Sequence, residues 1–193
     1  MKYSVILADP PWGYQNWTDA KQGAASAAYP VLKDKDIINL PVQNIAEKDA
    51  MLFMWCTWPK LEIGLQAMAA WGFEYVTTPL VWVKTNADGS PYHGIGFWAL
   101  GGSEFVLMGR RGKGIKRDPS TKGKVKQVFT APRTKHSAKP HQCREHFLSL
   151  VGHDNKRIEL FSREQVDGWD ATGLDLDGKD IREFLNANTA SPV

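Results

Sequence analysis

The sequence contains no long run of apolar residues. No uncharged apolar stretch approaches the roughly twenty residues that are needed to cross a membrane, and residues 1–8 enter a strand-like pattern without the apolar segment of a secretory signal. Cysteine is scarce as well, because Cys56 and Cys143 are the only two and form no C-x-x-C pair. These absences argue against a membrane-spanning or disulfide-stabilised protein. We therefore expect a protein of the reducing cytoplasm.

Internal repeats and linkers between domains are absent too. The chain has 193 residues, of which 42% are hydrophobic and 23% charged, a balance that suits a globular domain with a substantial core. We predict a single domain over residues 1–187 and a frayed tail at residues 188–193.

Acidic residues are nearly absent from residues 110–139. This stretch holds eleven Lys or Arg residues and one acid, Asp118, so it carries about +10, although the whole chain carries only +3. One interpretation is a solvated loop rich in lysine. The interpretation that we favour at this charge density is a surface that neutralises the phosphates of nucleic acid, because each phosphate contact releases counterions.

Strand-like and helix-like patterns alternate along the chain. Strands are expected at residues 3–8, 50–56, 73–84, 104–109, 124–129 and 156–162, and helices at 34–40, 59–71, 139–151 and 180–188. This alternation predicts an α/β fold with helices on both faces of one sheet. In such sheets, ligands bind outside the carboxyl ends of the strands.

The tetrapeptide Asp9-Pro10-Pro11-Trp12 directly follows the first predicted strand. Two consecutive prolines stop both strand and helix, so Asp9 is expected at a strand end with a stiff loop behind it. A carboxylate and a rigidly held carbonyl can accept both N–H bonds of an aromatic amine, which raises the electron density on its nitrogen as positive charge develops. Trp12 offers a face on which a base can stack, after flipping out if it belongs to a duplex. The alternative is that Asp9 caps a turn and Trp12 packs in the core.

Further motifs follow the tetrapeptide in order along the chain. They are Tyr29-Pro30, Leu40-Pro41, Met51-Leu52-Phe53-Met54-Trp55, Trp71-Gly72-Phe73, Val81-Trp82-Val83-Lys84, Gly94-Ile95-Gly96-Phe97-Trp98, Glu104-Phe105-Val106-Leu107-Met108-Gly109-Arg110, His136-Ser137-Ala138-Lys139-Pro140 and Arg157-Ile158-Glu159-Leu160-Phe161-Ser162-Arg163. Over residues 3–178 the chain thus resembles the MT-A70 family, which includes adenine-N6 methyltransferases of messenger RNA and of bacterial and phage DNA.

The resemblance implies a Rossmann-like methyltransferase in which the catalytic motif precedes the cofactor motif, a permuted order. It implies S-adenosylmethionine as the cofactor, although no G-x-G-x-x-G sequence occurs near the N-terminus. By similarity, Asp9 lies near the cofactor's amino group, Lys139 and Arg163 contact its carboxylate or ribose end, and Glu159 and Phe161 face it from a strand end. Cations at a helix start and just past a strand suit an anionic carboxylate.

One segment departs from the family pattern. Where the family usually has Gly-Asn-Glu or Gly-Asn-Gln, this chain has Gly173-Leu174-Asp175. Asp175 can still accept hydrogen bonds from the ribose hydroxyls, but the Asn donor is missing. We expect this departure from the family pattern to affect the affinity for the cofactor rather than catalysis.

The substrate is expected to contact aromatic, glycine and basic residues. Tyr29 lines the base pocket or makes a hydrophobic contact at a helix entry. Gly96 and Trp98 lie in a loop near the substrate, with burial of Trp98 in the core as the alternative. Glu104, which opens the following strand, is a weaker candidate for orienting the surroundings of Asp9. The basic residues expected at the nucleic acid are Arg110, Arg111, Lys113, Arg133 and His136.

Two of these basic residues have other interpretations, and neither indicates a metal. Arg133 is either a phosphate contact or a solvated charge, and His136 shapes the cofactor pocket or touches phosphate. His141 and His146 are five residues apart and would diverge on a helix, and Cys143 has no partner at C-x-x-C spacing. We expect no metal site.

The resulting prediction is an adenine-N6 methyltransferase that acts on DNA, because the small chain resembles bacterial and phage members. It would then work in the cytoplasm of a bacterium or of a phage-infected cell. The alternatives are an RNA adenosine methyltransferase and a non-catalytic nucleic-acid-binding partner of the same fold, which the intact Asp-Pro-Pro-Trp disfavours. A homodimer is a further hypothesis, because one small domain offers a limited surface for gripping a duplex.

Overall fold

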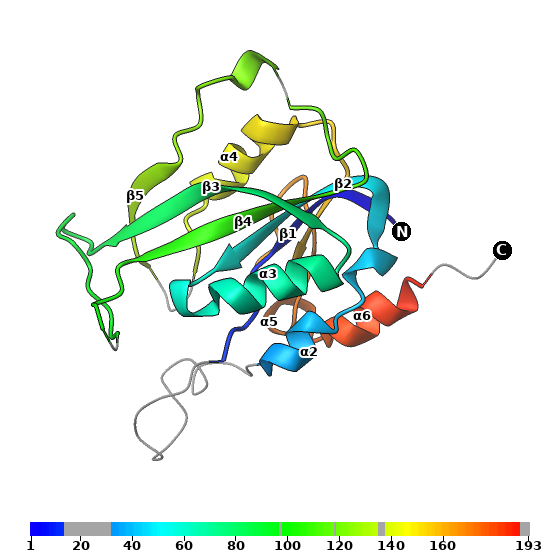
Figure 1. The fold of residues 1–193 in the computed structure, drawn as a ribbon, viewed down its shortest axis with the longest axis horizontal. Coiled ribbons are helices and arrows are strands. Elements are labelled where there is room, and N and C mark those ends of the chain that lie inside the picture. Colours follow the sequence, from blue (N-terminus) through cyan, green and yellow to red (C-terminus); the bar gives the residue numbers. More distant parts are fainter. Residues whose placement is uncertain (14–31, 97, 118, 135–137, 190–193) are drawn as a thin grey trace.

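The computed structural model describes residues 1–13, 32–96, 98–117, 119–134 and 138–189 (Figure 1). At its centre lies a seven-stranded sheet with the order β5-β3-β4-β2-β1-β6-β7. The strands are β1 (Tyr3–Ala8), β2 (Ala46–Cys56), β3 (Glu74–Thr85), β4 (Ser103–Arg111), β5 (Val128–Pro132), β6 (Arg157–Leu160) and β7 (Asp170–Thr172). Neighbouring strands are parallel except at β4, which is antiparallel to both β2 and β3.

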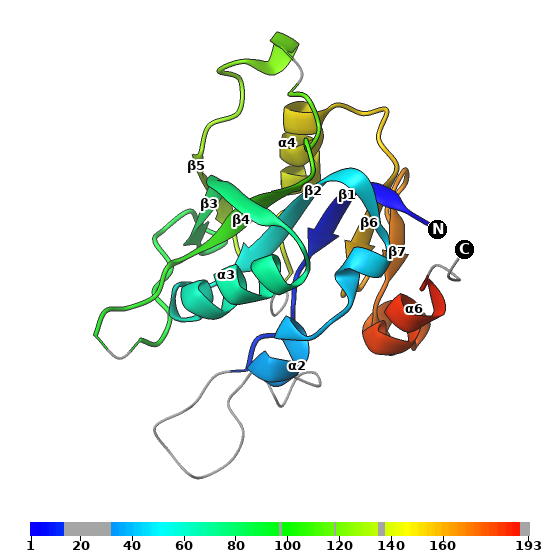
Figure 2. The same ribbon diagram turned by 45° about the vertical axis from the view of Figure 1, so that its right-hand side comes forward.

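Helices pack against both faces of the sheet (Figures 1 and 2). The helices of the described part are α2 (Asp34–Ile38), α3 (Leu61–Ala70), α4 (Gln142–Val151), α5 (Leu174–Asp177) and α6 (Ile181–Ala187). α2, α3 and α6 share a core with one face, whereas α4 covers the other, where Phe147 stacks on Phe53 with 4.6 Å between ring centroids. The predicted Rossmann-like α/β sheet with helices on both faces is confirmed.

The register places the carboxyl ends of β1, β2 and β6 at one edge of the sheet. Ala8 at the end of β1 pairs with Met54 and with Leu160, while Cys56 at the end of β2 pairs with Phe105 near the start of the antiparallel β4. We call this side of the sheet the carboxyl edge. None of the helices in the described ranges has the length and apolar character to cross a membrane.

Among the predicted boundaries that differ from the structure, β2 begins at Ala46 instead of Ala50, and two others are wrong for local reasons. The strand predicted at residues 124–129 begins only at Val128, because its partner β3 contains Pro79, which has no N–H for the ladder, and pairing starts at Val81. The helix predicted from Lys139 begins at Gln142, because Pro140 disfavours the helical conformation for the residue before it. Lys139 therefore lies in the segment before α4 and not at its first turn.

A short strand, β7, and a short α-helix, α5, were not predicted. Three residues in β7 and four in α5 are too few to show a period of hydrophobic residues. The predicted tail at residues 188–193 lies beyond α6, and residues 190–193 lie outside the described part.

Candidate active site

Asp9 lies at the carboxyl edge in the middle of the sheet. Its backbone N–H donates to the carbonyl of Leu160 at 3.4 Å, so the chain is still held by β6 at this point. From β1 the sheet extends through β2 in one direction and through β6 and β7 in the other. Asp9 therefore occupies the topological switch point at which open α/β sheets bind ligands.

Pro10, Pro11 and Trp12 form a tight turn behind Asp9. The Pro10 carbonyl accepts the backbone N–H of Trp12 at 2.8 Å, which fixes its direction, and its second lone pair can accept another donor. Trp12 is only 4% exposed, and its indole N–H donates to the carbonyl of Trp55 at 3.1 Å. Trp12 thus packs in the core here, as in the alternative interpretation of the sequence, and base stacking on Trp12 stays a prediction.

A chain of four charged side chains connects Asp9 to β3 and β4. Lys139 Nζ lies 2.7 Å from Asp9 Oδ2 and 3.3 Å from Glu104 Oε2. Lys84 Nζ, from β3, lies 2.5 Å from Glu104 Oε1. The signs alternate along this chain, so its formal charges cancel. We call Asp9, Lys139, Glu104 and Lys84 the buried charge network.

Aromatic rings enclose this network. Lys139 Nζ lies 5.5 Å from the centroid of a Trp55 ring and Lys84 Nζ lies 5.1 Å from that of Trp82, both within cation–π range. Glu104 is 8% exposed, although it is a charged residue. Carboxylates and ammonium groups tolerate such burial only when they are paired, so each member of the network depends on its neighbours.

Burial and pairing set the pKa values of the carboxyl groups. Burial raises the pKa of Asp9, and the negative charge of Glu104 adds to this rise, while Lys139 opposes it. The pKa of Glu104 is instead lowered, because two ammonium groups outweigh the effect of its burial. Asp9 and Glu104 together raise the pKa of Lys139, which stays protonated. A carboxylate with a raised pKa is a better hydrogen-bond acceptor and base than an exposed one.

Glu159, predicted from the family resemblance to face the cofactor, is held by a residue that the sequence did not indicate. Arg144 of α4 donates to both of its carboxylate oxygens, at 2.8 and 3.1 Å. The same guanidinium lies 3.1 Å from Glu164. Arg144 therefore ties α4 to β6 and to the segment that follows it, and direct contact of Glu159 with a cofactor stays a prediction.

Phe161, Arg163 and Asp175 meet at the ends of β6 and β7. Phe161 has a φ of +63°, a left-handed conformation that is uncommon outside glycine and recurs at functional sites. A Cβ at Gly173 would lie 2.2 Å from the carbonyl oxygen of Ser162, so only glycine allows the two segments to approach. Arg163 Nε lies 3.5 Å from Asp175 Oδ2, and Leu174, in place of the family's Asn, is 52% exposed. The structure thus brings these three predicted cofactor residues together.

The loop between β3 and β4 extends from the carboxyl edge. A Cβ on Gly96 would lie 1.9 Å from the carbonyl oxygen of Ala99, so the turn itself requires glycine there. Trp98 is fully exposed, which contradicts the alternative that it packs in the core. Arg133, which follows β5 at the same edge, stacks over the ring of Tyr92 with 4.2 Å from its guanidinium carbon to the ring centroid.

Several predicted substrate residues do not join this edge. Arg110 pairs with Met51 and Arg111 with Ala50, five and six residues before the end of β2 at Cys56, and Lys113 follows them. Arg110 is moreover paired with Glu74 at 3.0 Å. These three residues therefore lie away from Asp9 in the sheet, and their contact with nucleic acid stays a prediction. Tyr29 and His136 lie outside the described residues.

Trp58 is an exposed aromatic residue at the carboxyl edge that the sequence interpretation did not single out. It follows β2, and half of its surface is exposed. Its ring lies 4.4 Å from that of Phe105, and its indole N–H donates to Ser103 Oγ at 2.8 Å. These two contacts fix the ring, and its exposed surface is available to a planar partner.

The two histidines and the cysteine in or next to α4 lie in different environments. Cys143 is buried in the core, His146 packs edge-on against Phe129, and His141 lies 3.4 Å from Glu164. Within the described ranges, no group of three His, Cys, Asp or Glu side chains could hold a metal ion.

Comparisons of the sequence with known proteins identify its family. The profile of the MT-A70 family matches residues 3–175. The Type II methyltransferase M.MunI of a Mycoplasma species is 34% identical over 193 residues, which cover 91% of this chain and 78% of that protein. The N(6)-adenosine-methyltransferase catalytic subunit METTL3 of Homo sapiens and its Danio rerio counterpart are each 29% identical over 189 residues. The chain spans less than a third of these two relatives, 29% and 28% of their lengths. Because the family profile covers most of the chain, the protein belongs to the MT-A70 family of adenine-N6 methyltransferases.

Proposed function

We propose that the protein transfers a methyl group from S-adenosylmethionine to the exocyclic N6 of adenine in DNA. The observation that carries this proposal is the Asp9 carboxylate at the switch point of the sheet. Lys139 holds its Oδ2 at 2.7 Å, while the rigid Pro10 carbonyl follows in the chain. A carboxylate and a carbonyl that are fixed in this way suit the two N–H bonds of an aromatic amine.

The residues around the carboxyl edge fit S-adenosylmethionine by their chemistry. The carboxylates of Asp9 and Asp175 suit an ammonium group and ribose hydroxyls, and the guanidinium of Arg163 suits a carboxylate. The close approach of Gly173 to Ser162 brings the two supporting segments together. When bound, S-adenosylmethionine supplies a methyl group on a positively charged sulfur.

The residues of the chain would then act by positioning and by charge. Asp9 and Pro10 orient the amine so that its lone pair faces the methyl carbon. The methyl group would pass to N6, and the donor would leave with the electron pair of its carbon–sulfur bond. N6 gains positive charge, and Asp9 is the neighbouring base that can accept its excess proton. Lys139 keeps the Asp9 carboxylate in place throughout.

A DNA substrate is favoured over RNA by the pattern of similarity. The bacterial type II methyltransferase is 34% identical to this chain, which covers 78% of its length. The two METTL3 relatives, which are named for the ribonucleoside adenosine, are 29% identical to this chain, which covers less than a third of their lengths. These relatives make RNA adenosine the second candidate.

The test of this preference offers the protein three polymers of one sequence with a labelled methyl donor. Duplex DNA, single-stranded DNA and RNA are digested to nucleosides after the reaction. We expect N6-methyldeoxyadenosine to be the main labelled product. A larger yield of N6-methyladenosine from RNA would overturn the assignment to DNA.

Trp58 is expected to stack a base of the nucleic acid at the carboxyl edge. Base–aromatic stacking contributes about 1–3 kcal/mol, so Trp58→Ala should raise KM for the polymer about fivefold to a hundredfold. The expected kcat and affinity for S-adenosylmethionine are those of the wild type. Trp58→Phe keeps a ring face but loses the bond to Ser103, and it should recover most of the affinity. An unchanged KM in Trp58→Ala would exclude this role.

A further inference from the structure

The loop between β4 and β5 lies at the end of the sheet opposite the carboxyl edge (Figures 1 and 2). We call residues 112–127, with 118 outside the description, the basic loop. Glu104 pairs with Trp82 at the carboxyl edge, whereas Arg110, six residues further along β4, pairs with Met51. At roughly 3.3 Å per residue, the loop begins about 20 Å from the buried charge network.

The cations of the basic loop are exposed and lack acidic partners. Its basic residues are Lys113, Lys116, Arg117, Lys122, Lys124 and Lys126. Over the part of the chain that the structure describes, none of them forms an ion pair. Cations elsewhere do, as Lys60 does with Asp34 at 2.8 Å and Arg144 with Glu159 at 2.8 Å. A stretch of unpaired cations is a ready surface for polyanions.

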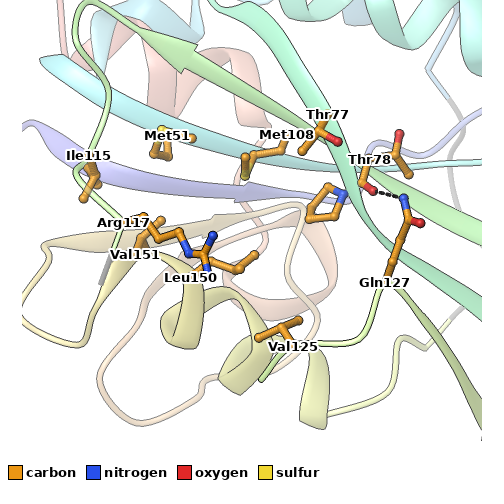
Figure 3. Close-up of a pocket in the computed structure, with 11 residues that line it drawn as sticks. Met51, Thr77, Thr78, Met108, Ile115, Arg117, Val125, Gln127, Leu150 and Val151 are labelled. Carbon is orange, nitrogen blue, oxygen red and sulfur yellow. Dashed lines mark hydrogen bonds between the residues drawn. The ribbon is translucent and has the colours of Figure 1, made fainter. Parts of the chain in front are cut away.

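Hydrogen bonds anchor the two ends of the loop. The backbone N–H of Lys113 donates to Asp49 Oδ1 at 2.6 Å. Gln127 Nε2 donates to the carbonyl of Thr78 at 2.7 Å, as Figure 3 shows. The cations between these two hydrogen bonds therefore lie on a segment whose ends are fixed.

Apolar contacts hold the middle of the loop. Ile115 and Val125 turn inward and pack against the core on the α4 face. They help to line a hollow of about 340 Å³ between the loop, the sheet and the end of α4 (Figure 3). The inward residues thus tether the loop while its lysines stay in solvent, which reduces the entropy lost when a ligand binds.

We propose that the basic loop binds phosphates of the nucleic-acid substrate about six base pairs away from the adenine at Asp9. This inference rests on the proposed function, and the distance follows because 20 Å corresponds to about six steps of 3.4 Å along one strand. Residues 112–127 contain no aromatic side chain that could stack on a base. Through its phosphate contacts the loop supplies affinity and orientation rather than stacking on bases.

The test reverses two charges of the loop and compares substrates of different length. Lys122→Glu/Lys124→Glu is matched by Lys35→Glu/Lys179→Glu, which makes the same charge change at two other exposed positions. Dissociation constants and KM are measured on duplexes with about 3 or about 15 base pairs on each side of the target adenine. Salt screens exposed charges beyond about 8 Å, so only a duplex that reaches the loop should respond.

For the loop variant, we expect the Kd and KM of the long duplex to rise at least tenfold. The slope of log K against log salt should become shallower by about two, at about 0.9 per lost phosphate contact. The short duplex should keep its wild-type kcat and KM, which also shows that the variant is folded.

Three outcomes would overturn the inference, and a further one concerns only the proposed function. The inference fails if the long duplex binds the loop variant as it binds the wild type, if the control variant loses as much affinity, or if the short duplex is equally affected. The wild type could bind long duplexes more tightly than short ones, and the loop variant could lose this difference, while the wild type methylates no duplex. That result would support the role of the basic loop and contradict the proposed function.

Discussion

Replacing Asp9 by Asn is expected to lower kcat for methyl transfer by about 10³-fold, the effect of removing one preorganised group that stabilises developing charge. Asn has the same shape but no negative charge, and it offers an N–H donor toward the amine where an acceptor is needed. Lys139 keeps Glu104 as a partner at 3.3 Å, so the fold should survive. Single-turnover rates with saturating S-adenosylmethionine measure the effect.

A matched carboxylate elsewhere provides the control for this result. Asp34 pairs with Lys60 at 2.8 Å on α2, and Asp34→Asn should leave kcat unchanged. Calorimetry should show that Asp9→Asn still binds S-adenosylmethionine, with an affinity reduced about tenfold by the loss of one charge near its ammonium group, because Arg163 and Asp175 remain. Loss of cofactor binding together with turnover would contradict the assignment of Asp9 mainly to the amine.

Glu104→Gln is the second substitution with a large expected effect. It removes the carboxylate between Lys84 and Lys139, and it leaves two largely buried ammonium groups with Asp9 as their remaining partner in the network. Breaking a buried ion pair on one side typically costs 3–5 kcal/mol; because both lysines keep some exposure, we expect about 3 kcal/mol at neutral pH. Denaturant unfolding measures this loss. It should fade in acid, because the lowered pKa of Glu104 means that its stabilisation is lost as pH falls through that pKa.

If Glu104 positions Lys139 at Asp9, Glu104→Gln should change catalysis as well as stability. The Glu104 charge raises the pKa of Asp9, so its removal should lower that pKa and shift the acid limb of the kcat/KM profile to lower pH. Its loss should also lower kcat about tenfold or more, because Lys139 is no longer held from two sides. A purely structural role would leave the profile where it is.

The control for Glu104→Gln lies in the same pair of strands. Glu74 pairs with Arg110 across β3 and β4, but both side chains are about half exposed or more. Glu74→Gln should cost less than about 1 kcal/mol and leave the pH profile unchanged. Equal effects of the two substitutions would show that burial of the network has no special consequence.

The elements with clear patterns were predictable from the sequence, and so was the position of Asp9. The apolar run before Asp9 and the two prolines after it define a strand end, and β1 has the predicted bounds, Tyr3–Ala8. Likewise, the turn after β6 was predicted to carry Arg163. These features are local, so a single sequence contains the information.

The buried charge network could not be predicted in the same way. Lys84, Glu104 and Lys139 are separated by 20 and 35 residues, and only the pairing of β3 with β4 and the path of residues 138–141 bring them together. Glu104 was therefore a weak candidate from the sequence, although it lies at the centre of the network. A buried acid at the start of a strand was the only signal.

The position of the basic residues relative to Asp9 could not be predicted from the sequence either. Arg110, Arg111 and Lys113 lie at or just past the carboxyl end of an apolar strand, as Asp9 does, but β4 runs antiparallel to β2. The carboxyl end of β4 therefore lies away from the carboxyl edge. Strand direction depends on the whole sheet, so composition could indicate a phosphate-binding surface without giving its place.

The most direct test of the central claim identifies the atom that receives the methyl group. Duplex DNA is incubated with the protein and a methyl-labelled donor and digested, and the labelled nucleosides are identified by mass spectrometry. We predict label on N6 of deoxyadenosine with the wild type and almost none with Asp9→Asn. Label on cytosine or on a ring nitrogen, or equal labelling by the two proteins, would contradict the account of Asp9 as the group that activates the adenine amine.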